Sequence, residues 1–300
     1  MKRHLKIILI IASVLLAVSL VTGILAVTLF GDEKGPVDTL GYGQVGDPAD
    51  LTSGEKIAGY ANVLDYGATP DDNTDDTAAF EAAIKKNIGV YVPAGVYKVS
   101  RPLPFNNQNF FGDGSKATQI ISTMTDKTKP ILYLGGSSTL YDMSLGYDSA
   151  LVDGSEQQGQ RVAVMCGAAI AFGPGGGIKD VTISHVGTAV RSDASDGFGT
   201  TNCGFNRIRI ENSTYCGFDF NCDAGLGSIF NQITATGCKG QGIFTFTGSG
   251  GTDSLKGVTI EGCKLKYAVG YTELAGVTAE EPACIDSELS DNALYLIEEE

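Results

Sequence analysis

Four stretches in the second half of the chain share one pattern of residues: KDVTISHVG (179–187), NRIRIENST (206–214), FNQITATGC (230–238) and KGVTIEGCK (256–264). Their apolar markers are Ile183, Ile210, Ala235 and Ile260, so the pattern recurs after 27, 25 and 25 residues. A looser fifth copy, CIDSELSDNALYL, follows at 284–296. Periods of about 20–50 residues are typical of solenoids, propellers and other repeat arrays.

The content of each repeat selects among these architectures. Each copy has two or three short strands and no helix, which excludes the helical repeats. One coil cannot bury its inward apolar residues alone, whereas coils stacked at about 4.8 Å form a continuous core and pair their backbone groups. Propeller blades need roughly 40–50 residues, more than this period provides. We therefore predict an all-β, single-stranded parallel β-helix with coils of about 25 residues and roughly eight coils after Gly89.

A second distinctive stretch, DYGATPDDNTDDTAAF (65–80), holds five aspartates in sixteen residues. The pattern from Asp75 to Lys86 predicts a helix, and Thr74 or Asp75 would cap its first N–H groups. Aspartates that follow a proline are typical of turns. We therefore predict that this cluster is structural. One alternative is a calcium ion held by Asp71, Asp72 and Asp75, because hard oxygen ligands suit it; the other is a catalytic role for the cluster.

Three segments of the N-terminal half carry a resemblance to a known family: ANVLDYGATPDDNTDDTAAFEAAI (61–84), GVYVPAGVYKVSRPL (89–103) and NFFGDGSKATQI (109–120). They resemble the start of the pectate-lyase-superfamily proteins, which include rhamnogalacturonase-, polygalacturonase- and epimerase-like enzymes, β-1,3-glucanases and phage tailspikes. The resemblance implies a right-handed β-helix closed at its N-terminal end by a capping helix. It also implies a carbohydrate substrate and catalytic groups on the outside of the middle coils.

The motifs of two specific activities are missing. The chain has no Gly-His-Gly, and RIRI (207–210) lacks the lysine of the polygalacturonase pattern. The Asp-Pro-His motif of alginate-type epimerases is also absent. The resemblance therefore predicts the fold and a carbohydrate ligand, but it does not predict which reaction the protein catalyses.

Candidate catalytic residues fall between positions 191 and 223. Strand alternation in CGFDFNCD (216–223) places Asp219 and Asp223 outward, and one period earlier Arg191 lies about one residue from the position under Asp219. A polar, glycine-rich segment that contains Asp196 would overhang them. Two carboxylates with an arginine can act as general acid and base in glycoside hydrolysis. In a lyase, an arginine base beside a calcium-binding aspartate would serve instead. Ordinary solvated positions of a solenoid are the non-catalytic interpretation.

The N-terminus predicts a membrane helix. Residues 7–30 contain no charge and are long enough to span a bilayer as a helix. Basic residues precede them and Asp32 and Glu33 follow, which places the rest of the chain outside the cell. A cleaved signal peptide is the alternative. We predict a cytoplasmic tail (1–6), a transmembrane anchor (7–30), a flexible linker (31–58) and a β-helix domain (59–300) whose native chain can continue beyond Glu300.

Charge and cysteine content limit the partners further. Without Lys2, Arg3 and Lys6, the exported part has 18 basic and 35 acidic residues, a net charge near −17. Such a surface repels phosphate backbones, so we expect no nucleic-acid partner. Cys238 and Cys263 occupy equivalent positions one coil apart, which predicts a stacked pair of thiols or, alternatively, a disulfide.

The best hypothesis from the sequence is an exported, membrane-tethered β-helix that acts on polysaccharide as a hydrolase or lyase. The alternative is a non-catalytic, tailspike-like module that binds carbohydrate. Nothing in the sequence identifies an oligomeric state.

Overall fold

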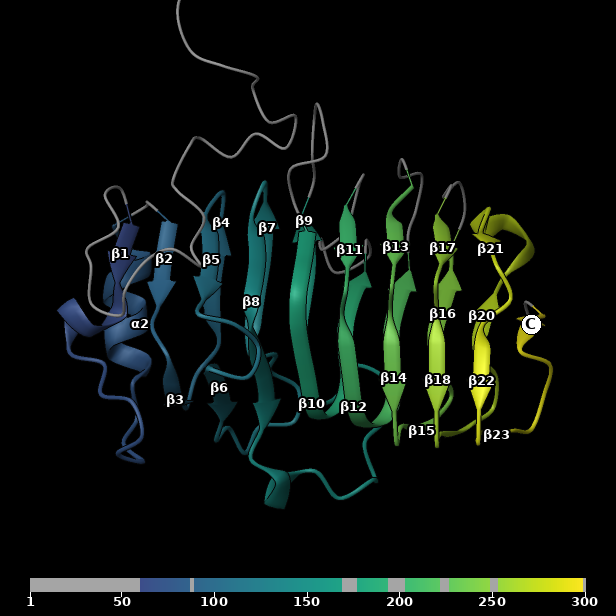
Figure 1. Ribbon diagram of the computed structural model, residues 1–300, viewed down its shortest axis with the longest axis horizontal. Helices are drawn as coiled ribbons and strands as arrows, with labels where there is room; N and C mark the ends of the chain where they lie inside the picture. Colours follow the sequence, from purple (N-terminus) through teal and green to yellow (C-terminus); the bar gives the residue numbers. More distant parts are fainter. Residues whose placement is uncertain are drawn as a thin grey trace, which may run out of the picture. The chain divides into compact units, whose positions relative to one another are not determined.

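The computed structural model describes residues 60–86, 89–168, 177–193, 203–221, 227–248 and 253–298. They form a parallel β-solenoid whose coils succeed one another along its axis (Figure 1). The predicted tail, anchor and linker lie outside the described residues. Among the residues that the structure describes, no helix is long and apolar enough to cross a membrane.

The strands of successive coils pair into three parallel faces. The first face contains β1 (Tyr60–Asn62), β2 (Gly89–Val92), β5 (Asn109–Gly112), β8 (Thr139–Tyr147), β10 (Gly177–Asp193), β11 (Gly204–Asn206), β13 (Ile229–Asn231), β17 (Ser254–Lys256) and β21 (Thr278–Ala279). The second contains β3 (Gly95–Val99), β6 (Thr118–Ser122), parts of β8 and β10, the start of β12 (Arg209–Asn221), β14 (Thr234–Thr236), β18 (Thr259–Glu261) and β22 (Ala283–Ile285).

The third face carries the candidate site. It contains β4 (Leu103–Asn106), β7 (Leu132–Gly136), β9 (Val162–Ala168), the ends of β10 and β12, β16 (Gly242–Thr247), β20 (Val269–Tyr271) and β24 (Leu294–Leu296). The short strands β15 (Lys239–Gly240), β19 (Lys264–Leu265) and β23 (Glu288–Leu289) form a separate ladder between the second and third faces. The described residues also contain three 3₁₀ turns: η2 (Val63–Tyr66), η3 (Ser149–Leu151) and η5 (Glu273–Ala275).

The register of the second face confirms the repeat read from the sequence. Ile183 pairs with Ile210, Ile210 with Ala235, and Ala235 with Ile260, so the four markers are strand neighbours. Ile260 pairs in turn with Cys284, which places the looser fifth copy on the next coil. All four markers are buried. The period therefore reflects one inward position repeated on each coil.

Stacked aromatic rings fill the core of the middle coils. Phe205 and Phe230 lie parallel with ring centroids 4.7 Å apart, and Phe218 and Phe244 lie parallel at 4.9 Å. Such pairs contribute about 0.5–1.5 kcal/mol each beyond the area they bury. These rings fill the interior between the first and third faces, and the alternate residues of β12 and β16 point outward.

One irregularity changes the register beside the candidate site. The pairing of β10 with β12 shifts by one residue between Val186 and Thr188. Paired residues of the two strands are therefore 27 residues apart in sequence before the shift and 28 apart after it, on the third face. Gly187 lies at this shift, where a Cβ would meet the carbonyl oxygen of Gln160 at 2.3 Å. The missing side chain lets the 152–161 loop approach β10 closely.

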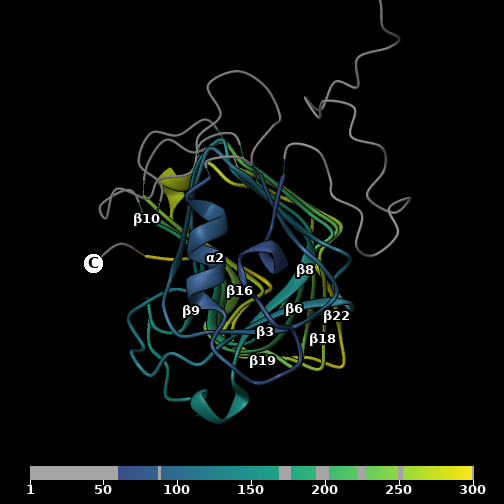
Figure 2. The same cartoon turned by 90° about the vertical axis from the view of Figure 1, so that its left-hand side faces the viewer.

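The predicted helix is present, although it is shorter than expected. α2 runs from Thr77 to Ile84, against the predicted Asp75 to Lys86. Its Phe80 ring packs edge-on against Tyr97 and Phe110 in the first coils. In the end-on view, α2 lies in front of the first strands (Figure 2).

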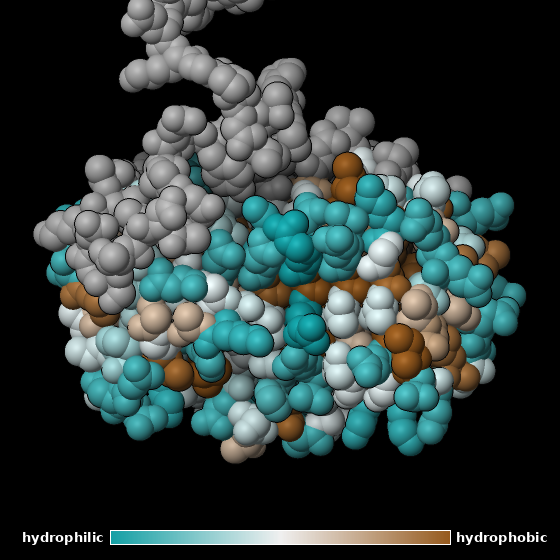
Figure 3. Space-filling model, in the orientation of Figure 1, coloured by the Kyte–Doolittle hydropathy of each residue, from teal (hydrophilic) through white to brown (hydrophobic). Residues whose placement is uncertain are grey.

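The two stacked cysteines are free thiols. The backbone N–H of Cys238 donates a hydrogen bond to Sγ of Cys263 at 3.2 Å, and both residues are buried. The predicted stacked pair is confirmed, and the alternative disulfide is not formed. Figure 3 shows hydrophilic residues interspersed with pale and hydrophobic ones on one face of the molecule.

Candidate functional site

The N-terminal aspartates are bound by the chain itself. Asp75 accepts hydrogen bonds from the first N–H of α2, that of Thr77, at 3.1 Å and from the Ser100 hydroxyl at 2.6 Å. Asp72 accepts from the backbone N–H and the hydroxyl of Thr74 at 2.8 and 2.7 Å. Asp71 accepts from the N–H of Val96 at 3.0 Å. These bonds confirm the prediction of capping and turn roles: Asp75, one residue before the N-cap Asp76, accepts the first helical N–H, and Thr74 does not.

The calcium alternative finds no support in this arrangement. The three carboxylates that were to hold the ion each face donors from the chain, and the described residues contain no group of three side chains placed to bind a metal. The aspartate cluster is therefore part of the scaffold.

Two of the four predicted site residues meet on the third face. Arg191 on β10 and Asp219 on β12 are direct strand neighbours, one position closer than the sequence predicts. Nε of Arg191 lies 3.6 Å from Oδ2 of Asp219. The extra residue at the register shift accounts for the correction, because a 28-residue interval on this face brings the two into line. The other two, Asp196 and Asp223, lie outside the described residues.

Three further residues, none of them among the predicted catalytic residues, complete the cluster. Asp193 contacts Nη2 of Arg191 at 2.5 Å through its Oδ2. The Asn221 amide donates to Oδ1 of Asp193 at 3.2 Å, and the Gln158 amide donates to Oδ2 of Asp219 at 3.2 Å. We refer to Gln158, Arg191, Asp193, Asp219 and Asn221 as the outer acid cluster.

The omissions have different causes. Asp193 lies two residues after Arg191 on the same strand, so strand alternation alone places both side chains on one face. Asn221 follows from Asp219 in the same way. Gln158 comes from a loop without a period, and no pattern in the sequence connects it to a coil.

The two acids of the cluster are almost fully buried although they lie outside the core. Asp219 is 3 % exposed and Asp193 is 5 % exposed. Burial raises the pKa of Asp219 above its ordinary value, and the charge of Asp193 acts in the same direction. The Gln158 hydrogen bond and the Arg191 guanidinium lower that pKa and offset only part of the effect. Asp219 therefore holds a proton to a higher pH than an exposed aspartate does.

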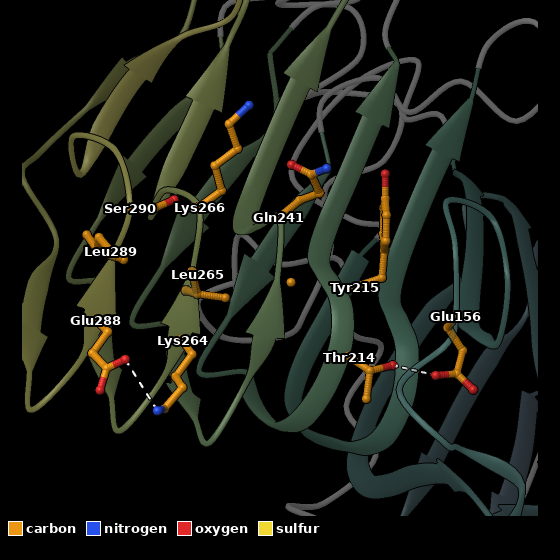
Figure 4. Close-up of a pocket in the computed structure, with 11 residues that line it drawn as sticks. Glu156, Thr214, Tyr215, Gln241, Lys264, Leu265, Lys266, Glu288, Leu289 and Ser290 are labelled. Carbon is orange, nitrogen blue, oxygen red and sulfur yellow. Dashed lines mark hydrogen bonds and ion pairs between the residues drawn. The ribbon is translucent and has the colours of Figure 1, made fainter.

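A groove of about 710 Å³ lies next to this cluster. It runs over the corner ladder β15, β19 and β23, and Figure 4 shows the side chains that line it. They are Glu156, Thr214, Tyr215, Gly240, Gln241, Lys264, Leu265, Lys266, Glu288, Leu289 and Ser290. Two elements connect groove and cluster. Tyr215 lines the groove, and burial raises its pKa; the charge of nearby Asp219 raises the pKa of Tyr215 further. Glu156 also lines the groove and precedes Gln158 of the cluster by two residues.

The loop that supplies Gln158 is anchored by a buried carboxylate. Glu156 accepts the N–H of Gly154 at 2.9 Å and the hydroxyl of Thr214 at 2.8 Å. Its side chain has no exposed surface. Farther along the loop, a Cβ on Gly159 would meet Nη1 of Arg191 at 2.4 Å, so the guanidinium lies directly against the loop backbone. The loop thus forms a fixed wall that holds one side of the outer acid cluster.

Comparison with known proteins identifies the family. The family model described as "Rhamnogalacturonase A/epimerase, pectate lyase-like" matches residues 60–274. The chain belongs to this family. The resemblance seen in the N-terminal motifs is thereby confirmed over most of the described coils. No curated protein matches the sequence.

Solved structures agree on the fold of this pectate-lyase-like chain. The catalytic domain of Agl-KA superposes with a TM-score of 0.55 and 18 % identity over 79 % of the chain. The catalytic domain of a GH87 α-1,3-glucanase variant in complex with tetrasaccharides gives 0.53 and 15 % over 73 %, and the catalytic unit of a GH87 α-1,3-glucanase from Streptomyces thermodiastaticus gives 0.51 and 17 % over 79 %.

The aligned part of these structures covers 44 %, 41 % and 42 % of their own lengths. The chain therefore spans less than half of each. At these identities the similarity establishes a common fold.

Proposed function

We propose that the protein acts on polysaccharides and that it is a glycoside hydrolase whose reaction takes place at the outer acid cluster. The observation that carries this proposal is Asp219, a buried carboxyl with a raised pKa that lies in register with Arg191. A general acid must keep its proton until the substrate is bound, and burial is the usual way to achieve this for a carboxyl. Membership of a family that includes rhamnogalacturonase supports a carbohydrate substrate.

In the proposed reaction, Asp219 donates a proton to the glycosidic oxygen as the bond between this oxygen and the anomeric carbon breaks. Asp193 is the second carboxylate, which activates a water molecule or stabilises the positive charge at the anomeric carbon. Arg191 pairs with Asp193 at 2.5 Å and fixes its position, and Gln158 orients Asp219. Asp196 and Asp223, which were predicted from the sequence, stay in the proposal as further candidate catalytic carboxylates.

The contacts of Arg191 favour hydrolysis over elimination. In a lyase this arginine would have to accept a proton from the sugar ring. Its Nε and Nη2 instead face the carboxylates of Asp219 and Asp193, and a charged guanidinium has no lone pair to accept a proton. We therefore assign Arg191 to the ordering of the two acids.

The test is the activity of an Asp219→Asn variant on a panel of plant, fungal and bacterial polysaccharides. Asp253→Asn is the matched control, because Asp253 is also buried with a pKa raised by burial but lies outside the cluster. Loss of product in Asp219→Asn alone supports the proposal. Equal activity in both variants and the wild type contradicts it.

A second candidate function is a carbohydrate-binding module without catalysis. The observation that favours it is the near-complete burial of Asp219 and Asp193, which lets them serve as structural ion pairs. Binding on a glycan array without product in mass spectrometry, for the wild type as well as for Asp219→Asn, would select this second candidate.

We also propose that the protein is exported and that residues 7–30 tether it to the membrane, with the β-helix outside. The uncharged run of 24 residues and the basic residues before it support this placement. Protease treatment of intact cells should degrade the domain, and alkaline extraction should leave the full chain in the membrane fraction. Release of the domain into the medium would instead indicate a cleaved signal.

A further inference from the structure

We propose that the groove over β15, β19 and β23 binds an uncharged glycan chain and selects against chains of uronic acids. This inference rests on the proposed function, since it names the class of substrate that the same site would take. It is drawn from the shape of the groove and from the partners of its charged side chains.

The groove runs across successive coils. Gly240, Leu265 and Leu289 are strand neighbours, and the backbone bond from Gln241 to Tyr215 extends the series to β12. Three coil intervals of about 4.8 Å each give a length of about 14 Å, which exceeds one sugar ring and suits an oligosaccharide. A glycan chain that runs along the axis would therefore contact side chains from four successive coils.

The lining offers what sugar rings require. Half-buried Leu289 supplies apolar surface for the C–H faces, whereas Leu265 is only 5 % exposed. Figure 4 shows the Tyr215 ring beside Gln241. The hydroxyl of Tyr215, the amide of Gln241 and the hydroxyl of Ser290 each donate or accept hydrogen bonds. Groups of this kind recognise hydroxyls, which are themselves both donors and acceptors.

Of the two lysines that line the groove, Lys264 has a carboxylate partner, and Lys266 lies over an aromatic ring. Nζ of Lys264 lies 3.3 Å from Oε2 of Glu288, and Nζ of Lys266 lies 5.2 Å from the centre of the Tyr295 ring. In the adjoining cluster, Arg191 contacts Asp193 and Asp219. A chain of uronic acids brings a carboxylate on every sugar, and each needs a cation that it does not have to share.

The charge of the whole chain acts in the same direction. Its formal net charge of −14 repels a polyanion at distances up to the screening length. An uncharged chain meets no such barrier, and its affinity has no electrostatic term that salt would screen. The salt dependence of binding is therefore the most specific readout of this inference.

The experiment uses the full-length Asp219→Asn variant, which binds without turnover. It is titrated calorimetrically with uncharged oligosaccharides of glucose, xylose and mannose, including α-1,3-linked glucans, and separately with oligogalacturonate, at low and high ionic strength. We expect an uncharged oligosaccharide to bind with a Kd that does not change with salt. Tyr215→Ala should weaken this binding about tenfold, while Tyr141→Ala, on the first face, should leave it unchanged.

A second variant tests the charge argument by gain of function. Glu288→Gln removes the partner of Lys264, so we expect affinity for oligogalacturonate to rise several-fold and to fall again with salt, with no change for the uncharged chain. Preferential binding of oligogalacturonate by the parent variant would overturn this inference and leave the proposed function intact. Failure of every glycan to bind would overturn both.

Discussion

The aspartates at 71–76 and the acids of the outer cluster show two different uses of the same side chain. In the first region the carboxylates are close in sequence and accept hydrogen bonds from backbone N–H groups and hydroxyls of the turn and of β3. In the second, Asp193 and Asp219 are 26 residues apart, and strand pairing brings both against one guanidinium. The density of acids in a sequence is therefore a poor guide to chemistry, and the neighbours on adjacent coils are a better one.

The largest expected effect separates the two regions by activity. Asp219→Asn should lower kcat by a factor of about 10²–10⁴, the usual contribution of a general acid, and should leave the fold intact. Asp75→Asn, in the first region, should retain wild-type kcat. Initial rates on the polysaccharide identified by the panel provide the measurement, and a similar loss in both variants would remove the distinction.

The next largest effect concerns stability in the outer cluster. Arg191→Met removes the guanidinium that contacts both buried acids, so we expect the free energy of unfolding to fall by about 3 kcal/mol at neutral pH. Urea titration followed by circular dichroism measures it. In the background of Asp193→Asn and Asp219→Asn, the same Arg191→Met change should have a much smaller effect. An equally large loss in that background would show that the ion pairs are not its cause.

The corresponding change in the first region should be smaller. Asp75→Ala removes the acceptor for the first N–H of α2, so we expect a loss of about 1 kcal/mol in the free energy of unfolding. Glu261→Ala, which alters an exposed carboxylate on β18, is the control and should have little effect. If Asp75→Ala matched the control, Asp75 would have no capping role.

The smallest effect is the opposite pH dependence of the two regions. Burial alone would raise the pKa of Asp75, but the Ser100 and Thr77 hydrogen bonds hold it below its ordinary value. Its contribution to stability is therefore present above about pH 4 and is lost as the pH falls through the folded-state pKa. The pKa of Asp219 is raised by burial, so its contribution is present below about pH 4 and is lost as the pH rises through the folded-state value.

Two variants make this difference measurable. The destabilisation caused by Asp75→Asn should shrink as the pH falls below about 4, and Asp219→Asn should gain stability relative to the wild type as the pH rises above about 4. Thermal unfolding across this pH range tests both. Parallel curves for the two variants would mean that the two acids do not differ in environment as described.

The sequence predicted the solenoid because its repeat is a physical one. Ile183, Ile210 and Ala235 recur since each occupies the same inward position, and the structure pairs them as expected. Arg191 and Asp219 were predicted one residue out of line, because a local register shift does not appear in the average period. The role of Gln158 could not be predicted at all, since the loop that carries it has no repeat and reaches the cluster only through its fold.

The most direct test of the outer acid cluster as a hydrolytic site is to digest the polysaccharide panel in water enriched in ¹⁸O and to analyse the products by mass spectrometry. Hydrolysis transfers oxygen from water to the new reducing end. We therefore expect the wild type to give ¹⁸O-labelled, saturated products and Asp219→Asn to give no labelled product. Unlabelled products with a double bond would show elimination. Labelled products from both proteins would show that Asp219 is not the acid.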